Sequence, residues 1–280
     1  MKNLISILAI AITFCDCNSN PTVSDKEAKN NSDSIPAKDS LIVQVPLDTI
    51  TTLKDFTGDS AFFKAPNGKV YKMIASIDSS MMEETSSDFA PANKSLAGLN
   101  CENDKFAGTH RKAAKTSIVT GSYRKFESLE EFLATLQDDE EMRIHPEISR
   151  DENNKRVAEE KRNVHLKNVY LAAIVRESDN DFHIIITDGK GTYFNIENSG
   201  LLSTSSANYT ALKKARTQIE DFFGEYCSSK YWKMSPIIEI EVKGSLFYDI
   251  DHKPGIVGPN GLKPTTAWEI HPITDIKFYE

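Results

Sequence analysis

Cysteine is scarce in this sequence, and the patterns that would tie it to a known chemistry are missing. The chain has four cysteines but no Cys-x-x-Cys pair, which argues against a thiolate zinc site and a thioredoxin-type dithiol. It also lacks a His-Glu-x-x-His motif, a Gly-x-Ser-x-Gly nucleophile elbow and the spaced aspartates of a calcium loop. No motif in the sequence therefore commits the protein to one reaction.

Positive charge is also in short supply. The 33 lysines and arginines are outnumbered by 41 aspartates and glutamates, which gives a formal net charge of −8. Nucleic-acid affinity depends largely on basic side chains that neutralise phosphates, so nucleic acid is disfavoured as a partner. Binding of single-stranded nucleic acid by the barrel is kept as a third hypothesis. It predicts that the affinity falls as the salt concentration rises. The locally basic segment Thr109–Lys115 is interpreted as a solvated face.

The N-terminal residues have the pattern of an export signal. Met1–Asn3 carries a positive charge, and Leu4–Phe14 is an apolar run of secretory length that is too short to span a bilayer. Cys15 follows this run directly, as in a bacterial lipobox, and is the predicted lipidation site. Residues 1–15 are thus the expected signal and lipobox, and residues 16–40 the expected disordered tether. We expect a protein of the cell envelope that is anchored to a bacterial membrane through lipid; secretion without an anchor is the alternative.

Two further cysteines, Cys101 and Cys227, lie in the body of the chain. In an oxidising compartment outside the cell they can form a disulfide. The alternative is a pair of independent buried thiols.

Residues 41–124 are predicted to be a small β-containing region of unknown type. Asn67-Gly68 separates two strand-like runs within Phe62–Tyr71, which indicates a hairpin. No function follows from this region.

Residues 125–163 are predicted to contain a helix and a charged connector. Ser128 and Glu131 have the spacing of a capping box, and leucines and a phenylalanine follow at helical spacing. The densely charged stretch Arg150–Asn163 is interpreted as a solvated connector.

Residues 164–280 alternate between strand and helix patterns. The predicted strands and helix are, in order, Val164–Glu177, Phe182–Thr187, Thr192–Glu197, the helix Ser206–Phe223, Ile237–Asp249 and Ala267–Phe278. Three strands, a helix and two strands are the order of the five-stranded OB-fold barrel, so the predicted fold class is mainly β with α. In that fold the second and third strands and two loops form the binding surface. The corresponding loops here are the acidic residues 177–181 and the Gly- and Pro-rich residues 251–264.

Three motifs occur in order within this part of the chain. They are Glu177-x-Asp179-x-Asp181-Phe182-His183, Gly244-x-Leu246-Phe247-Tyr248-Asp249-x-x-His252 and Trp268-Glu269-Ile270-His271-Pro272. Together they resemble the signature of a family of uncharacterised exported bacterial proteins with an OB-like domain. The resemblance covers about residues 125–280. It implies the fold and export, and it implies no activity.

Polar residues with ligand chemistry gather in these motifs. The candidate ligand-binding residues are Glu177, Asp179, Asp181, His183, Asp249, His252, Glu269 and His271. Alternation along a strand places Glu269 and His271 on one face. Imidazole and carboxylate groups suit zinc or manganese, and carboxylates suit calcium, so a divalent metal is chemically compatible although no cofactor is assigned.

These residues support three interpretations. We expect a non-enzymatic binding module that takes a small ligand, an oligosaccharide or a protein through the barrel face and the two loops. The alternative is a metal-dependent hydrolase, similar to staphylococcal-type nucleases, in which His183, Glu269 and His271 act with neighbouring acids. Those enzymes place arginines against the phosphate, whereas here only Arg176 and Arg216 are near the motifs. In the third interpretation the same polar groups pair with one another and hold the loops together.

Overall fold

The structure of the protein is a computed structural model. It describes residues 49–50, 58–76, 103–226, 228 and 230–279. The chain divides into residues 1–43 and a compact unit from Gln44 to Glu280, and every described residue belongs to the second unit. The predictions for the signal, the tether, Cys15 and the Cys101–Cys227 pair fall outside the described residues. Within the described part of the chain, no helix is long and apolar enough to cross a membrane.

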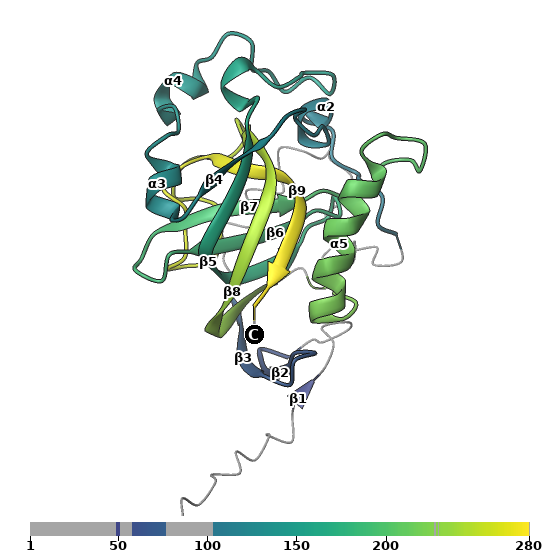
Figure 1. The fold of residues 1–280 in the computed structure, drawn as a ribbon, viewed down its shortest axis with the longest axis vertical. Helices are drawn as coiled ribbons and strands as arrows, with labels where there is room; N and C mark the ends of the chain where they lie inside the picture. The colour runs from purple at the N-terminus through teal and green to yellow at the C-terminus, as the bar shows by residue number, and fades with distance from the viewer. Residues whose placement is uncertain (1–48, 51–57, 77–102, 227, 229, 280) are drawn as a thin grey trace, which may run out of the picture. The chain divides into compact units, whose positions relative to one another are not determined.

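The compact unit is mainly β, with a few helices and one large sheet. Its strands are β1 (Thr49–Ile50), β2 (Ser60–Lys64), β3 (Val70–Ser76), β4 (Tyr123–Phe126), β5 (Asn163–Arg176), β6 (Phe182–Thr187), β7 (Tyr193–Asn198), β8 (Tyr231–Tyr248) and β9 (Trp268–Phe278). Its helices are α2 (Lys112–Lys115), α3 (Leu129–Leu133), α4 (Asp139–Arg143), the 3-10 helix η1 (Ala158–Glu160) and α5 (Tyr209–Phe223). Figure 1 shows the long strands β5, β8 and β9 and the helix α5, which packs against β9.

Five of these strands pair in a closed ring, here called the strand ring. β5 pairs with β6, β6 with β7, β7 with β9, β9 with β8, and β8 pairs with β5. The β7–β9 pair is parallel and the other four pairs are antiparallel. The predicted order of three strands, a helix and two strands is confirmed, and the predicted limits agree closely except at the start of β8.

β8 begins at Tyr231 rather than at the predicted Ile237. The sequence pattern breaks at Pro236, because a proline removes a hydrogen-bond donor and usually ends a strand. In the structure β8 continues through Pro236 and its first residues pair with β3. The predicted hairpin with the Asn67-Gly68 turn is confirmed as β2 and β3, and it belongs to the same sheet as the strand ring.

The main hydrophobic core lies on one side of β6, β7 and β9. The side chains that these strands contribute to it are Phe182, Ile184, Ile186, Phe194, Ile196, Trp268, Ile270, Ile273 and Ile276. Helix α5 adds Ile219, Phe222 and Phe223. Trp268 is buried in this core, as predicted. Because side chains alternate along a strand, the intervening residues point to the opposite side of the sheet.

The segment before β5 is attached to the strand ring by buried charges. Arg111 and Lys115 are buried, so the prediction of a solvated face over Thr109–Lys115 is wrong for them. Arg156 and Glu160 are buried too, which corrects the prediction of a solvated connector. Dense charge usually remains in water, but a buried charge is tolerated where it is paired and hydrogen-bonded.

The partners of these arginines explain their burial. Nη1 and Nη2 of Arg111 donate to the two carboxylate oxygens of Glu160 at 2.8 and 2.9 Å. Nη1 also donates to the carbonyl of Tyr248 at 2.8 Å. The guanidinium carbons of Arg111 and Arg156 lie 4.8 and 5.6 Å from the ring centroid of Phe247 on β8. The segment is thereby fixed to the end of β8 that leads into the candidate site.

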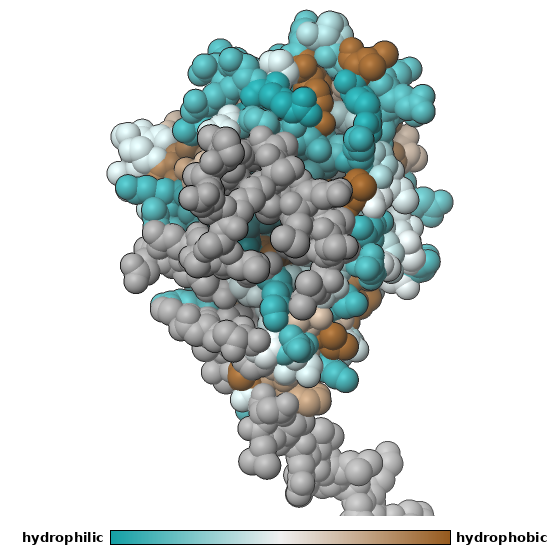
Figure 2. Space-filling view, turned by 180° about the vertical axis from the view of Figure 1, so that it is seen from behind, coloured by the Kyte–Doolittle hydropathy of each residue, from teal (hydrophilic) through white to brown (hydrophobic). Residues whose placement is uncertain are grey.

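Helix α3 begins with a side-chain cap, and one face of the described residues is mainly polar (Figure 2). The predicted cap of α3 is confirmed, because Ser128 Oγ accepts a hydrogen bond from the amide of Glu131 at 3.1 Å. The described residues on the face shown in Figure 2 are mainly hydrophilic, with hydrophobic residues in small, separate patches. That face offers no broad apolar surface on its described residues.

Candidate functional site

Three of the sequence-predicted residues, His183, Glu269 and His271, lie on the side of β6, β7 and β9 that faces away from the main core. Five residues of this side are here called the polar face: His183, Asn195, Glu197, Glu269 and His271. His183 on β6 pairs with Glu197 on β7, and Asn195 on β7 pairs with Glu269 on β9. All five residues are almost fully buried.

The strand register brings these side chains into contact. Nε2 of His183 lies 2.9 Å from Oε1 of Glu197. Nδ2 of Asn195 donates to the same oxygen at 2.7 Å and to Oε1 of Glu269 at 2.9 Å. Nδ1 of His271 lies 2.8 Å from the other oxygen of Glu197. Glu197 therefore stands at the centre of the polar face.

The acidic turn between β5 and β6 folds against one side of the polar face. Oδ2 of Asp181 lies 3.4 Å from Nε2 of His271, and Oδ1 of Asp181 accepts a hydrogen bond from the amide of Gly200 at 2.6 Å. Oε2 of Glu177 lies 3.1 Å from Nε2 of His183. Burial and the neighbouring Asp181 carboxylate raise the pKa of Asp179 to about 7. The turn is thus part of the site's wall, with Asp179 and Asp181 buried in it.

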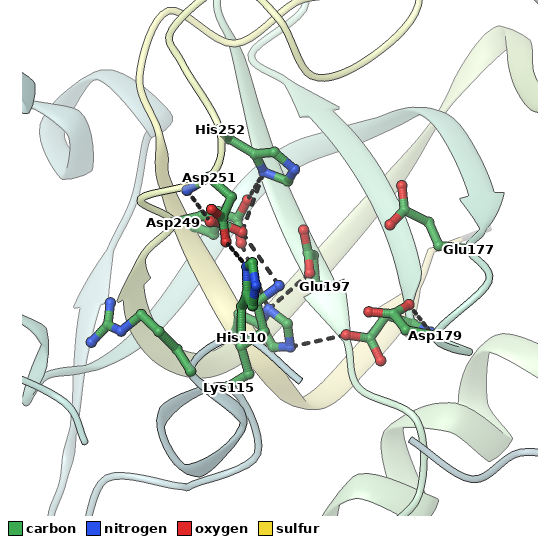
Figure 3. A network of polar contacts seen from close by, with 12 residues as sticks. His110, Lys115, Glu177, Asp179, Glu197, Asp249, Asp251 and His252 are labelled. Atoms are coloured by element: carbon green, nitrogen blue, oxygen red, sulfur yellow. Dashed lines mark hydrogen bonds and ion pairs between the residues drawn. The ribbon is translucent and has the colours of Figure 1, made fainter. Parts of the chain in front are cut away.

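The loop between β8 and β9 reaches the polar face from the other side. Nδ1 of His252 lies 3.1 Å from Oε1 of Glu269 and 3.4 Å from Oδ2 of Asp249. Figure 3 shows Glu197 between this group and the acidic turn that carries Asp179. Residues from the two predicted loops therefore meet at the same strands.

A hydrophobic contact and further ion pairs hold this loop in place. Val257 of the loop packs in a second buried cluster with Ile185 of β6. Nζ of Lys115 lies 3.4 Å from Oδ2 of Asp249, and Nδ1 of His110 lies 2.9 Å from Oδ2 of Asp251. The segment before β5 thus contributes basic groups that the sequence pattern had assigned to solvent.

The charges on the polar face shift one another's pKa. Burial alone would lower the pKa of His183, but the carboxylates of Glu177 and Glu197 raise it to about 10. Burial also lowers the pKa of His271, while the adjacent Glu197 raises it, and the net result lies well above the ordinary value. Burial would raise the pKa of Glu197, but the two histidines hold it well below its usual range. With only the protein's own groups present, the neighbouring carboxylates therefore favour the protonated form of both histidines.

The protonated histidines do not satisfy every acceptor of the site. Oδ2 of Asp181, Oε2 of Glu197 and Oε2 of Glu269 are all buried, and among the described residues none of them accepts a hydrogen bond of good distance and angle. Each has an ionic contact with His271, at 3.4, 2.8 and 3.6 Å respectively. An imidazolium has two N–H donors, and Nε2 of His271 also lies 2.9 Å from the hydroxyl of Ser199. His271 cannot therefore donate to three carboxylates at once.

Two overlapping groups on this face have the geometry of cation ligands. In the first triad, Asp181, Glu197 and His271 each offer one ligand atom, and these atoms lie within 4.8 Å of one another. In the second triad, Glu197, His252 and Glu269 do the same. Carboxylate oxygens and imidazole nitrogens suit zinc and manganese, so the residues present fit a divalent cation.

The structure brings together most of the site that the sequence predicted, and it adds residues that the sequence analysis missed. Six predicted residues meet on or beside the polar face: Asp181, His183, Asp249, His252, Glu269 and His271. Glu177 and Asp179 line its edge. Glu197 and Asn195 were missed, although the alternation of Phe194 and Ile196 with polar residues places them on that face. Lys115 was missed because it is distant in the sequence and no local pattern links it to the strands.

The chemistry of the site rests on the geometry of its own residues. A buried group of carboxylates and imidazoles can hold protons, a cation, or a cationic part of a ligand. Comparisons of the chain with protein-family models, with curated proteins and with solved structures found no match.

Proposed function

We propose that this chain is an exported, lipid-anchored binding module, that its strand ring is an OB-type barrel, and that the polar face binds a divalent cation. The barrel proposal is supported by the ring of five strands and by the helix between its third and fourth strands. In OB folds the second and third strands and two loops make the binding surface. Here these strands are β6 and β7, which carry three residues of the polar face.

One observation carries the cation proposal. Three buried carboxylate oxygens, on Asp181, Glu197 and Glu269, point at a single imidazole that cannot donate to all of them. A buried acceptor without a partner costs about 1–3 kcal/mol, and more when it is charged. A divalent cation bound by Asp181, Glu197 and His271 would remove this cost for the oxygens of Asp181 and Glu197. His183 would then hold Glu197 in position rather than bind the cation itself.

The surrounding residues fit the binding of a cation without catalysis better than they fit hydrolysis of a phosphodiester. A nuclease of the staphylococcal type needs arginines that face the phosphate. Arg176 and Arg216 are buried, and both lie against Asp104, at 3.2 and 3.0 Å. Arg111 and Arg156 hold the segment before β5 to β8. These four guanidinium groups are committed to structural contacts.

Metal content of the full chain tests the proposal. After dialysis against zinc or manganese and removal of free ion, we expect at least one bound cation per chain and a raised melting temperature, since a ligand that binds only the folded state stabilises it. Asp181→Asn and Glu197→Gln should both reduce the bound metal. Glu239→Gln, on an exposed position of β8, is the matched control and should bind as the wild type does.

Two results would contradict the proposal. Wild-type protein that binds no divalent cation, while His183→Ala and His271→Ala lose only thermal stability, would leave the structural network as the explanation. Turnover of a phosphodiester by the metal-loaded chain, lost in Asp181→Asn, would favour the hydrolase over the binding module.

Export and anchoring are proposed from the residues before the compact unit. The apolar run that ends at Cys15 supports them, as does the resemblance of the three motifs to exported proteins. Full-length chain expressed in a bacterium should sediment with membranes, and Cys15→Ser should release it to the soluble envelope fraction. Equal membrane association of both proteins would refute lipidation at Cys15.

A further inference from the structure

Glu197 belongs to both candidate triads, and its two oxygens face different neighbours. Oε1 lies 2.9 Å from Nε2 of His183 and 2.7 Å from Nδ2 of Asn195. Oε2 lies 2.8 Å from Nδ1 of His271. A carboxylate with two oxygens turned to different sides is the group that bridges paired metal ions, which in two-metal sites lie roughly 3.5–4 Å apart.

The second triad also contains a buried oxygen that lacks a hydrogen-bond donor. Oε2 of Glu269 is buried and makes no hydrogen bond with any described residue, and its ionic contact with His271 is long, at 3.6 Å. Oε1 of the same side chain already has Asn195 at 2.9 Å and His252 at 3.1 Å. The orphaned oxygen of Glu269 is distinct from the orphaned oxygen of Asp181, so one ion in the first triad does not account for both.

The charge of the buried groups also favours cations at this position. Four carboxylates surround it: Asp181, Glu197, Asp249 and Glu269. Lys115 pairs with one of them, because its Nζ lies 3.4 Å from Oδ2 of Asp249, and three carboxylates remain for cations to balance. Of the two other acids of the turn, Glu177 faces His183 and Asp179 lies beside Asp181.

We propose that the polar face holds two divalent cations bridged by Glu197, the first bound by Asp181 and His271 and the second by His252 and Glu269. This inference rests on the proposed function, because it assigns a second ion to the same face. Its consequence is that cation binding orders the loop 251–264, since His252 belongs to that loop and Glu269 to β9. The first ion ties the acidic turn to the strands, and the second ties the long loop to them.

The number and coupling of bound ions test this inference. The metal-free full chain is titrated with Mn²⁺, and the bound metal is counted by mass spectrometry. We expect two equivalents, with an electron paramagnetic resonance spectrum of a magnetically coupled pair in place of the six-line spectrum of isolated Mn²⁺. The spectrum needs no variant, so it stays decisive if a substitution prevents folding.

Variants of the second triad give the complementary measurement. Glu269→Gln and His252→Gln should each leave one equivalent and restore the six-line spectrum. Lys253→Gln, the exposed neighbour of His252, is the matched control and should keep two coupled ions. Amide hydrogen exchange of residues 251–264 should slow on adding Mn²⁺ in the wild type and not in His252→Gln.

The failures of the two proposals are distinguishable. No bound cation in the wild type overturns the proposed function and the pair together. One equivalent in the wild type that is unchanged in both Glu269→Gln and His252→Gln overturns the pair alone and leaves the first site standing. Two equivalents with an uncoupled six-line spectrum also overturn the bridge by Glu197.

Discussion

Arg111 and Glu160 form an ion pair whose side chains are 1% and 0% exposed. The pair is bidentate, and Glu160 also accepts a hydrogen bond from the amide of Tyr248 at 2.9 Å. Burying such a pair offers little net stability, but removing one partner leaves the other charge buried without compensation. The contribution of each residue is therefore seen only when it is removed alone.

We predict that Arg111→Ala lowers the free energy of unfolding by about 3–5 kcal/mol, because the Glu160 carboxylate then remains buried alone. Urea denaturation measures the loss. Lys112→Ala is the control: its pair with Glu152 is exposed on both sides, so its loss should cost about 1 kcal/mol or less. Equal effects of the two substitutions would show that the buried pair is not formed. The double variant Arg111→Met with Glu160→Leu should be less damaging than Arg111→Ala, because neither charge remains.

Glu241 on β8 shows how a carboxylate with little solvent exposure sets the dependence of stability on pH. Burial would raise the pKa of Glu241, but hydrogen bonds with Tyr279 and His165 and the charge of Lys277 lower it from 4.5 to about 2. The folded state thus prefers the ionised carboxylate more strongly than the unfolded state does. The resulting stability is present above pH 4.5 and is lost as the pH falls towards 2.

We predict that Glu241→Gln is less stable than the wild type at pH 7 by about 1 kcal/mol or less, a value discounted for solvent screening. The difference should shrink between pH 4.5 and pH 2, where the wild-type carboxylate also becomes neutral. Thermal unfolding at several pH values measures it. Glu239→Gln, on an exposed neighbouring position, should show no such trend. A difference that persists unchanged to about pH 2 would contradict the assignment.

At the scale of elements, the packing of β8 against β9 leaves no room for a side chain at Gly244. A Cβ atom there would lie 2.4 Å from Cγ2 of Ile270 and 2.5 Å from the carbonyl oxygen of Pro272. One of these neighbours is backbone, so it cannot move aside as a flexible side chain does. Glycine is therefore required by space at this position.

We predict that Gly244→Ala destabilises the protein by about 2 kcal/mol or more through overpacking between two strands of the ring. Gly191→Ala is the control, because its φ is +106° but no atom lies within 4 Å of the added Cβ. Gly191→Ala introduces backbone strain without a steric collision, so it should lower the free energy of unfolding by about 1 kcal/mol. Denaturant midpoints compare the two. If Gly191→Ala is the more damaging change, the close approach of β8 and β9 is not the cause.

The elements were predictable wherever side chains alternate, and the site was predictable only in part. The period of two along Phe182–Thr187 gives both the strand and the face of His183, and the structure confirms them. The same rule applied to β7 would have placed Glu197 opposite His183, so that residue was within reach of the sequence. The burial of Lys115 was not, because it depends on contacts between segments far apart in the chain. The position of the loop 251–264 depends likewise on the packing of Val257 against Ile185.

At the scale of the compact unit, the hairpin β2–β3 shares one core with the strand ring. Phe63 on β2 is fully buried, and its ring centroid lies 5.4 Å from that of Phe223 and 5.9 Å from that of Phe222 on α5. β3 pairs with the start of β8. The hairpin and the ring should therefore unfold together.

We predict that Phe63→Ala lowers the stability of the whole unit by about 3–5 kcal/mol, as expected for a large cavity in a core. Trp268 on β9 reports on the ring by fluorescence once Trp232, which pairs with β3 of the hairpin as well as with β5, is replaced by phenylalanine in both proteins, and circular dichroism reports on all strands. The two probes should show one shared transition at a lower denaturant concentration than in the wild type. Ile144→Ala, at an 81% exposed position, is the control and should have almost no effect. An unchanged fluorescence transition in Phe63→Ala would mean that the hairpin unfolds by itself.

The pairing of His183 with Glu197 has a consequence for how the chain folds. In the native alignment of β6 and β7, Ile184 faces Ile196 on the core side while the charged pair lies on the other. A slip of one residue would turn every side chain of one strand to the opposite face. It would drive charged groups into an apolar interior, at a cost of several kcal/mol for each. The charges that allow this face to bind a cation therefore also destabilise misaligned pairings of β6 and β7 during folding. A substitution that neutralises them is expected to give a mixture of folded forms.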